Sequence, residues 1–332
     1  MTSSPTPPQE PDHPSAPAAA PSSGAAARPS GTRALLPSEL DPTVFDEGFL
    51  RQLERLGVLM RQPARGGLKG GRRSVKRGQS VEFADYRDYT PGDDLRQLDW
   101  NVYARLEKLL VKLFVEEEDV TVTFLLDASP SMAFGRPEKL LFAKRAAAAL
   151  GYIALSGEDR VVLAALTGRT ARRYNGLRGS GRVFRLLANL SGVQPAEGPT
   201  DLLASARHAA SMLTGRGVVV LLSDLLDPAA DRVVRELAAT GSELIVLHTL
   251  SPEELDPPLE GDLKLVDSET GEGIDVTVDM AALDDYRARL DRWQTSLADL
   301  AMKRRASYVP ISTATPLADL VFAELRRRHV VG

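Results

Sequence analysis

The strongest constraint on the fold is a regular alternation of strand and helix patterns that occupies most of the chain. The segment Asp119–Leu126 is an apolar run rich in β-branched residues, and Gly217–Leu222 contains apolar residues only. Runs of this kind are typical of strands that are buried on both faces of a sheet. Helical patterns, such as those over Glu138–Leu155 and Ala282–Arg304, separate such strands. The alternation predicts an α/β fold with a doubly wound, mostly parallel sheet and helices on both faces.

Composition divides the chain into three parts, at residues 1–40, 41–115 and 116–328. The first part is rich in Pro, Ala, Ser and Gly, and we expect a disordered tail because it cannot bury enough apolar surface to order itself. The second part starts with a helical pattern over Asp41–Met60, with Asp41 as its N-cap. A basic glycine-rich loop and a polar-aromatic segment follow it. The third part holds the α/β domain.

Several classes of protein are excluded by composition. The chain has no cysteine, so it forms no disulfide, iron–sulfur cluster or cysteine nucleophile. Its four histidines lack the spacing of a zinc site, and a net charge of −4 argues against a general nucleic-acid binder. No segment reaches the roughly 18 apolar residues of a membrane span. We therefore expect a soluble cytoplasmic protein.

Oxygen-bearing side chains gather after the two most apolar strands. Asp127, Ser129 and Ser131 follow the first strand, Asp224 follows the second, and Thr200 stands just before a predicted helix. In a doubly wound sheet, the carboxyl ends of the strands gather ligands where the strand order reverses. Two carboxylates and three hydroxyls are hard ligands, which favour Mg²⁺, with Mn²⁺ or Ca²⁺ as alternatives, over Zn²⁺. The competing interpretation is that Ser131 and Thr200 only cap helices.

The motif Asp127-x-Ser129-x-Ser131, followed by Thr200 and Asp224, resembles the metal-ion-dependent adhesion site of von Willebrand factor type A domains. The resemblance implies that the two serines and the threonine bind the ion. It implies that the carboxylates support the ion directly or through water, and that a partner protein supplies the last ligand as Asp or Glu. Such a module binds proteins, so we expect no enzyme activity.

A second signature lies upstream, between Arg77 and Arg105. Its main pieces are Arg77-Gly78-Gln79-Ser80, Arg87-Asp88-Tyr89, Pro91-Gly92-Asp93-Asp94 and Leu98-Asp99-Trp100. The signature resembles the bacterial domain-of-unknown-function fifty-eight family, in which it precedes a type A domain. Relatives are commonly encoded beside MoxR-type AAA+ ATPases, in systems thought to assemble or remodel other proteins. The resemblance implies an adaptor that works with such an ATPase.

Two interpretations of the upstream signature stay open. Its acids and arginines can form an ion-pair network that docks the segment onto the sheet, with Trp100 buried. Alternatively, the segment presents an exposed surface for recognising a partner. We favour docking, and we then expect Trp100→Ala to destabilise the protein by about 3–5 kcal/mol.

Two other functions are kept as alternatives. The first is a metal-dependent phosphoesterase, which is disfavoured because no general base is evident beside the ion. The second is a nucleic-acid-associated factor that uses the basic segment 61–77. A phosphate loop at Gly66–Ser74 is disfavoured because no strand precedes it and Arg72 and Arg73 stand where the Lys–Ser/Thr pair belongs.

Overall fold

A computed structural model describes residues 41–61, 82–91, 93, 95, 98–115, 120–215, 217–267 and 271–320. The predictions for the tail 1–40, for the basic segment after Arg61 and for the chain beyond Leu320 lie outside these residues. Among the helices that the structure describes, none is long and apolar enough to cross a membrane.

The central sheet has seven strands and is mostly parallel. Its order is β11 (Ser307–Ser312), β8 (Glu243–Leu250), β7 (Gly217–Ser223), β3 (Thr121–Asp127), β4 (Arg160–Thr167) and β5 (Thr170–Arg173), and the short β6 (Leu177–Arg178) also pairs with β4. The strands from β11 to β4 run parallel, whereas β5 and β6 pair antiparallel with β4. The predicted α/β class with a mostly parallel sheet is confirmed.

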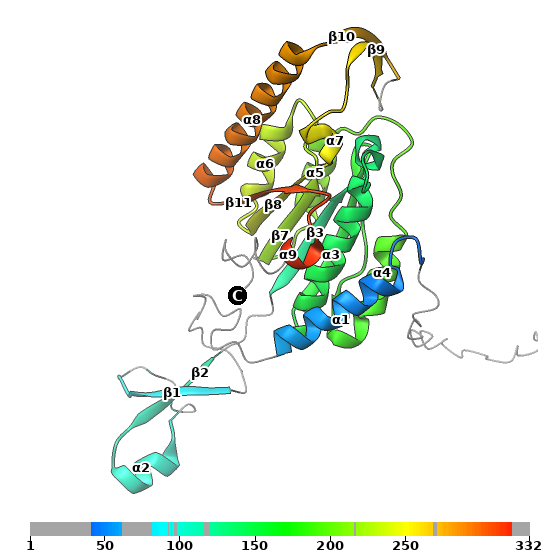
Figure 1. Ribbon diagram of the computed structural model, residues 1–332. Coiled ribbons are helices and arrows are strands. Elements are labelled where there is room, and N and C mark those ends of the chain that lie inside the picture. The colour runs from blue at the N-terminus through cyan, green and yellow to red at the C-terminus, as the bar shows by residue number, and fades with distance from the viewer. Residues whose placement is uncertain are drawn as a thin grey trace, which may run out of the picture. The chain divides into compact units, whose positions relative to one another are not determined.

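Helices cover both faces of this sheet (Figure 1). One face carries α3 (Lys139–Ser156) and α4 (Val183–Ser191), and α1 (Glu47–Arg61) packs on the outside of α3. The other face carries α5 (Leu202–Ser211), α6 (Ala230–Ala238) and α8 (Met280–Lys303). Because each face is covered, the inner strands can be apolar at every position.

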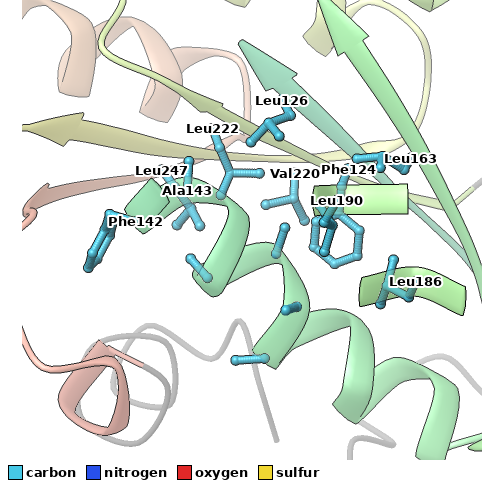
Figure 2. Packing of buried hydrophobic residues seen from close by; sticks show 14 of the residues in the cluster. Phe124, Leu126, Phe142, Ala143, Leu163, Leu186, Leu190, Val220, Leu222 and Leu247 are labelled. Carbon is cyan, nitrogen blue, oxygen red and sulfur yellow. The ribbon is translucent and has the colours of Figure 1, made fainter. Parts of the chain in front are cut away.

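The alternating side chains of β3 and β7 build two separate cores. Phe124, Leu126 and Leu222 belong to the core beneath α3 and α4 (Figure 2). Leu125 and Leu221, one position away on each strand, belong to the core on the opposite face. The period of two along a strand thus divides a consecutive apolar stretch, such as residues 124–126, between two layers of helices.

The N-terminal helix begins later than its sequence pattern indicates. The prediction of Asp41 as N-cap is wrong, because α1 starts at Glu47 and the Asp46 Oδ1 accepts from the Phe49 backbone N–H at 2.8 Å. Asp41 instead accepts from the backbone and hydroxyl of Thr43, in a turn that precedes the helix. A carboxylate can cap a turn or a helix, so the capping residue types alone do not fix where the helix starts, and Phe45 and Phe49 on either side of this start are both buried in the core.

Two hairpins complete the described chain, together with the short helices α7 (Pro252–Leu255) and α9 (Leu317–Asp319). The upstream hairpin pairs β1 (Glu82–Asp88) with β2 (Leu110–Val115), and α2 (Trp100–Leu106) lies between these strands in the chain. A second hairpin pairs β9 (Gly261–Val266) with β10 (Gly273–Val278) in antiparallel register.

The upstream signature forms the predicted polar network, but its tryptophan is not buried. Arg87 makes two bonds to the Asp93 carboxylate, at 2.6 and 2.7 Å, and the Tyr86 hydroxyl donates to Asp99 at 2.7 Å. Trp100 is 58% exposed and meets the Tyr103 ring edge-on. The prediction that docking buries Trp100 is therefore wrong. The residue begins α2 directly after its N-cap Asp99, and none of the residues of this short helix is buried.

Candidate metal centre

The strand order brings the two predicted carboxylates to one place on the sheet. The chain leaves β3 toward β4 on one side and later returns to β7 on the other, so the strand order reverses between β3 and β7. Asp127 is the last residue of β3, and Asp224 directly follows β7. The pairing of Leu126 with Leu222 sets the ends of the two strands level. Ligands of open α/β sheets bind at such a reversal.

The loop after β3 holds three of the five predicted ligands in one hydrogen-bonded arrangement. Asp127 is fully buried, and its Oδ1 accepts from the Ser129 backbone N–H at 2.9 Å. The hydroxyl oxygens of Ser129 and Ser131 lie 3.0 Å apart. Ser131 lies in a 3-10 turn, η3 (Pro130–Ala133), that starts right after Ser129. This early turn brings the two hydroxyls together.

The loop after β7 is held by its own side chains. The Ser223 hydroxyl donates to Asp127 Oδ2 at 2.5 Å and accepts from the Leu225 N–H at 2.9 Å. Asp224 Oδ1 accepts from the Leu226 N–H at 3.1 Å. These bonds hold Leu225 at a φ of 52°, in the left-handed region. That conformation costs about 1–2 kcal/mol for a residue with a side chain, so the loop geometry is imposed by its surroundings.

Thr200 lies on a third loop, which hydrogen bonds tie to both of the others. Its side chain is buried. Upstream, the Ala196 N–H donates to the Ala128 carbonyl at 2.7 Å. Downstream, the Leu202 N–H donates to Asp227 Oδ2 at 3.4 Å. The loop that carries Thr200 is thus anchored to the loops after β3 and after β7.

Neither Ser131 nor Thr200 is the N-cap residue of the helix or turn that it lies beside. Asp201 is the N-cap of α5, and its Oδ1 accepts from the Ala204 N–H at 2.9 Å. Ser131 lies inside the turn η3, whose N-cap position is Ser129. The capping interpretation therefore fails to account for Ser131 and Thr200.

A buried lysine, which the sequence analysis did not single out, contacts one of the predicted ligands. Lys139 opens α3, its side chain is 0% exposed, and its Nζ donates to Asp224 Oδ2 at 2.6 Å. The same ammonium also pairs with the Glu254 carboxylate. The sequence did carry a signal, because the first turn of a helix is an unfavourable place for a cation. A lysine there, next to an apolar run, implies acidic partners from elsewhere in the fold.

Glu254 is itself held in place at both carboxylate oxygens. It belongs to α7 and forms a capping box with Ser251, whose N–H donates to Glu254 Oε2 at 2.8 Å. Gly135 has a φ of 96°, and a Cβ there would overlap the Ser251 side chain. A glycine is therefore required where the chain before Lys139 passes α7.

A neutral histidine supports the Asp224 backbone from behind. His248 Nε2 lies 2.8 Å from the Asp224 carbonyl oxygen, and its Nδ1 lies 2.5 Å from the Tyr308 hydroxyl. The Nε2–H therefore donates to the carbonyl, while Nδ1 accepts from the hydroxyl. Burial is the main cause that lowers the pKa of His248 to about 4. The ring is thus a fixed structural support at neutral pH.

The pKa of Asp127 reflects its burial and the negative charge of Asp224 beside it. Burial first, and then the charge of Asp224, raise the pKa of Asp127 to about 7, although the Ser223 hydroxyl and the Ser129 N–H act in the opposite direction. A cation next to the Asp127 carboxylate would lower its pKa again, against the effects of burial and of the Asp224 charge.

The chemistry of the side chains fits a hard divalent cation. All five predicted ligands offer oxygen, and the hydroxyls of Ser129 and Ser131 already converge. Within the described ranges, no three His, Cys, Asp or Glu side chains are grouped to hold a metal ion. An ion at this edge would therefore need the hydroxyls as well as the carboxylates.

Comparisons with known proteins identify relatives over most of the chain. Uncharacterized proteins of Mycobacterium tuberculosis and Mycobacterium bovis are each 28% identical over 306 residues, which is 89% of this chain and 95% of theirs. A further uncharacterized protein, from Mycobacterium avium, is 31% identical over 122 residues, which is 35% of this chain and 70% of its own length.

Two solved structures resemble the chain in part. The conserved hypothetical protein BatB from Bacteroides thetaiotaomicron has a TM-score of 0.41 and 16% identity, and it covers 64% of this chain and 98% of its own. An aerotolerance-related membrane protein from Bacteroides fragilis has a TM-score of 0.37 and 19% identity, covering 58% and 91%. The family model described as "Protein of unknown function DUF58" matches residues 85–296. This match spans well over half of the chain, which therefore belongs to the DUF58 family.

Proposed function

We propose that this protein is a metal-dependent protein–protein interaction module. The observation that carries the proposal is the convergence of the Asp127-x-Ser129-x-Ser131 loop with the Asp224 loop at the point where the strand order reverses. A bound Mg²⁺ would supply a positive centre able to attract a carboxylate of a partner. Ser129, Ser131 and Thr200 would hold this ion, and Asp127 and Asp224 would support it.

Exposed apolar side chains on the same two loops support a protein partner. Phe134 follows η3 and is 50% exposed, and Leu226 stands two residues after Asp224 and is also 50% exposed. The Phe134 ring centroid lies 5.8 Å from the Lys139 ammonium, while the Leu226 N–H bonds to the Asp224 carboxylate. Both apolar side chains therefore stand close to the candidate metal centre. A charged centre with an apolar border is suited to a partner segment with an acidic residue beside apolar ones.

The partner class follows from the family resemblance. We propose that the module is an adaptor for a MoxR-type AAA+ ATPase, in the assembly or remodelling of other proteins. Either the ATPase or its client protein supplies the Asp or Glu side chain that binds the ion.

Two measurements test the proposal. Titration calorimetry on chelator-stripped protein should show one site for Mg²⁺ or Mn²⁺, and Asp224→Ala should abolish it. Affinity capture with a purified MoxR-type ATPase should require the divalent cation and should be lost with Ser129→Ala. Capture that is equally strong with chelator and with Ser129→Ala would reject the metal-dependent mechanism.

A further inference from the structure

The candidate metal centre contains a cation that belongs to the chain. The Lys139 side chain is completely buried, and its ammonium pairs with Asp224 and Glu254, which are 2% and 13% exposed. Its partners lie 85 and 115 residues away in the sequence, one on the loop after β7 and the other in α7. An ammonium removed from water in this way is stable only because both carboxylates are held against it.

The Lys139 ammonium is bonded to a carboxylate oxygen of Asp224 that a metal ion would also use. Asp224 Oδ2 accepts from Lys139 Nζ, and Asp224 Oδ1 accepts from the Leu226 N–H. Both oxygens of the carboxylate are therefore engaged within the chain. A divalent cation beside Asp224 would meet a nearby positive charge in a poorly solvated site, where like charges repel strongly.

We propose that Lys139 competes with the divalent cation for Asp224 and thereby sets the affinity of the site low. This inference rests on the proposed metal-dependent function. Without metal, the Lys139–Glu254 pair keeps the site folded. A divalent cation binds only by displacing the Lys139 ammonium from the Asp224 carboxylate. Interaction with partners would then respond to the concentration of divalent cation instead of being permanently switched on.

Lys144 offers a matched comparison on the same helix. It is also buried, at 5% exposure, but its charge interacts with Glu138 and Asp41, which are not among the predicted ligands. Replacing Lys144 with Met removes a buried positive charge from α3 without touching Asp224.

The experiment measures Mn²⁺ and Mg²⁺ affinity by titration calorimetry, together with the shift of the melting temperature on adding each ion. Four full-length proteins are compared: the unchanged chain, Lys139→Met, Lys144→Met, and the double variant Lys139→Met with Glu254→Gln. The double variant removes one charge of each sign, so its net charge equals that of the unchanged chain. A gain in affinity there cannot come from net charge alone.

We expect both Lys139 variants to bind Mn²⁺ at least tenfold more tightly than the unchanged chain, with a larger rise in melting temperature. We expect Lys144→Met to bind as the unchanged chain does. If a Lys139 variant is unfolded without metal, restoration of its circular dichroism spectrum by Mn²⁺ supports the inference, and failure of Mn²⁺ to restore it overturns the inference.

Two results separate this inference from the proposed function. If the unchanged chain binds the ion and neither Lys139 variant binds more tightly, competition by Lys139 is wrong although the metal centre stands. If no protein of the set binds either ion, the metal-dependent function itself is wrong, and the inference falls with it.

Discussion

Two ion-pair networks in this protein are built in opposite ways. In the upstream hairpin, Arg87 and Asp93 are six residues apart in the chain, and their side chains are 38% and 9% exposed, so solvent reaches the guanidinium. In the candidate metal centre, Lys139 and Asp224 are 85 residues apart, and their side chains are 0% and 2% exposed. The first network was anticipated from its sequence, and the second was not.

The difference concerns both predictability and energy. A local pair is visible in the sequence because a single turn brings its members together, but solvent screens it and it contributes little stability. A long-range buried pair forms only when the whole sheet forms. Removal of one partner then leaves an uncompensated charge that is buried away from water. The predictions below test this contrast, from the largest expected effect to the smallest.

The largest effect is expected from Asp224→Asn. Without added divalent cation, this change leaves the Lys139 ammonium with Glu254 as its single carboxylate partner, and the free energy of unfolding should fall by about 3 kcal/mol. Urea denaturation followed by circular dichroism measures it. Asp93→Asn is the matched change in the hairpin, and it should alter the transition far less. Equal losses of unfolding free energy in the two variants would show that the buried and the exposed networks do not differ in their contribution to stability.

A pH-dependent effect is expected from His248. Its pKa is about 4 in the folded protein and about 6.5 in the unfolded chain, so between these values the unfolded chain binds more protons. Acidification from pH 6.5 to 4 should therefore cost the protein up to about 3 kcal/mol through this residue.

The contribution of His248 is isolated by comparing the unchanged chain with His248→Gln across this pH range. Asp127 acts in the opposite direction, because its pKa is raised to about 7, but it is present in both proteins and cancels. The stability difference between the two proteins should shrink as the pH falls. A difference that stays constant from pH 7 to 4 would show that His248 does not titrate as described.

A smaller change in stability is expected from Ser129→Ala. The variant loses a hydroxyl that lies 3.0 Å from Ser131 Oγ, which should cost about 1 kcal/mol, because the Ser129 backbone N–H still bonds to Asp127. Its cation affinity should fall much more than its stability. Calorimetry and thermal melting on the same preparation compare the two. An unchanged Mg²⁺ affinity would remove Ser129 from the ligand set.

The smallest effect is expected from Trp100→Ala. The indole is 58% exposed, so its removal should change the free energy of unfolding by about 0.5 kcal/mol or less. Thermal melting measures it, with Phe124→Ala as a buried reference that should lose about 3–5 kcal/mol. A loss of several kcal/mol for Trp100→Ala would restore the docked arrangement that the structure contradicts.

Prediction from the sequence is correct where the determining interactions are local. The apolar and β-branched residues of β3 and β7 predicted strands covered on both faces, and the strand–helix alternation predicted the parallel sheet. It failed at Asp41 and at Trp100, because a capping carboxylate and an aromatic side chain can each serve in two environments. Packing on neighbouring elements chooses between those environments.

What the sequence determined by itself is therefore the strand–helix alternation of the α/β domain and the placement of Asp127 and Asp224 at strand ends. Strand and helix periodicities arise from the backbone geometry, so a few consecutive residues are enough to show them. Only the tertiary structure decided which charges meet: Lys139 with Asp224 and Glu254, and Ser223 with Asp127. Those contacts depend on strand order and on the path of three loops, and no short stretch of sequence contains this information.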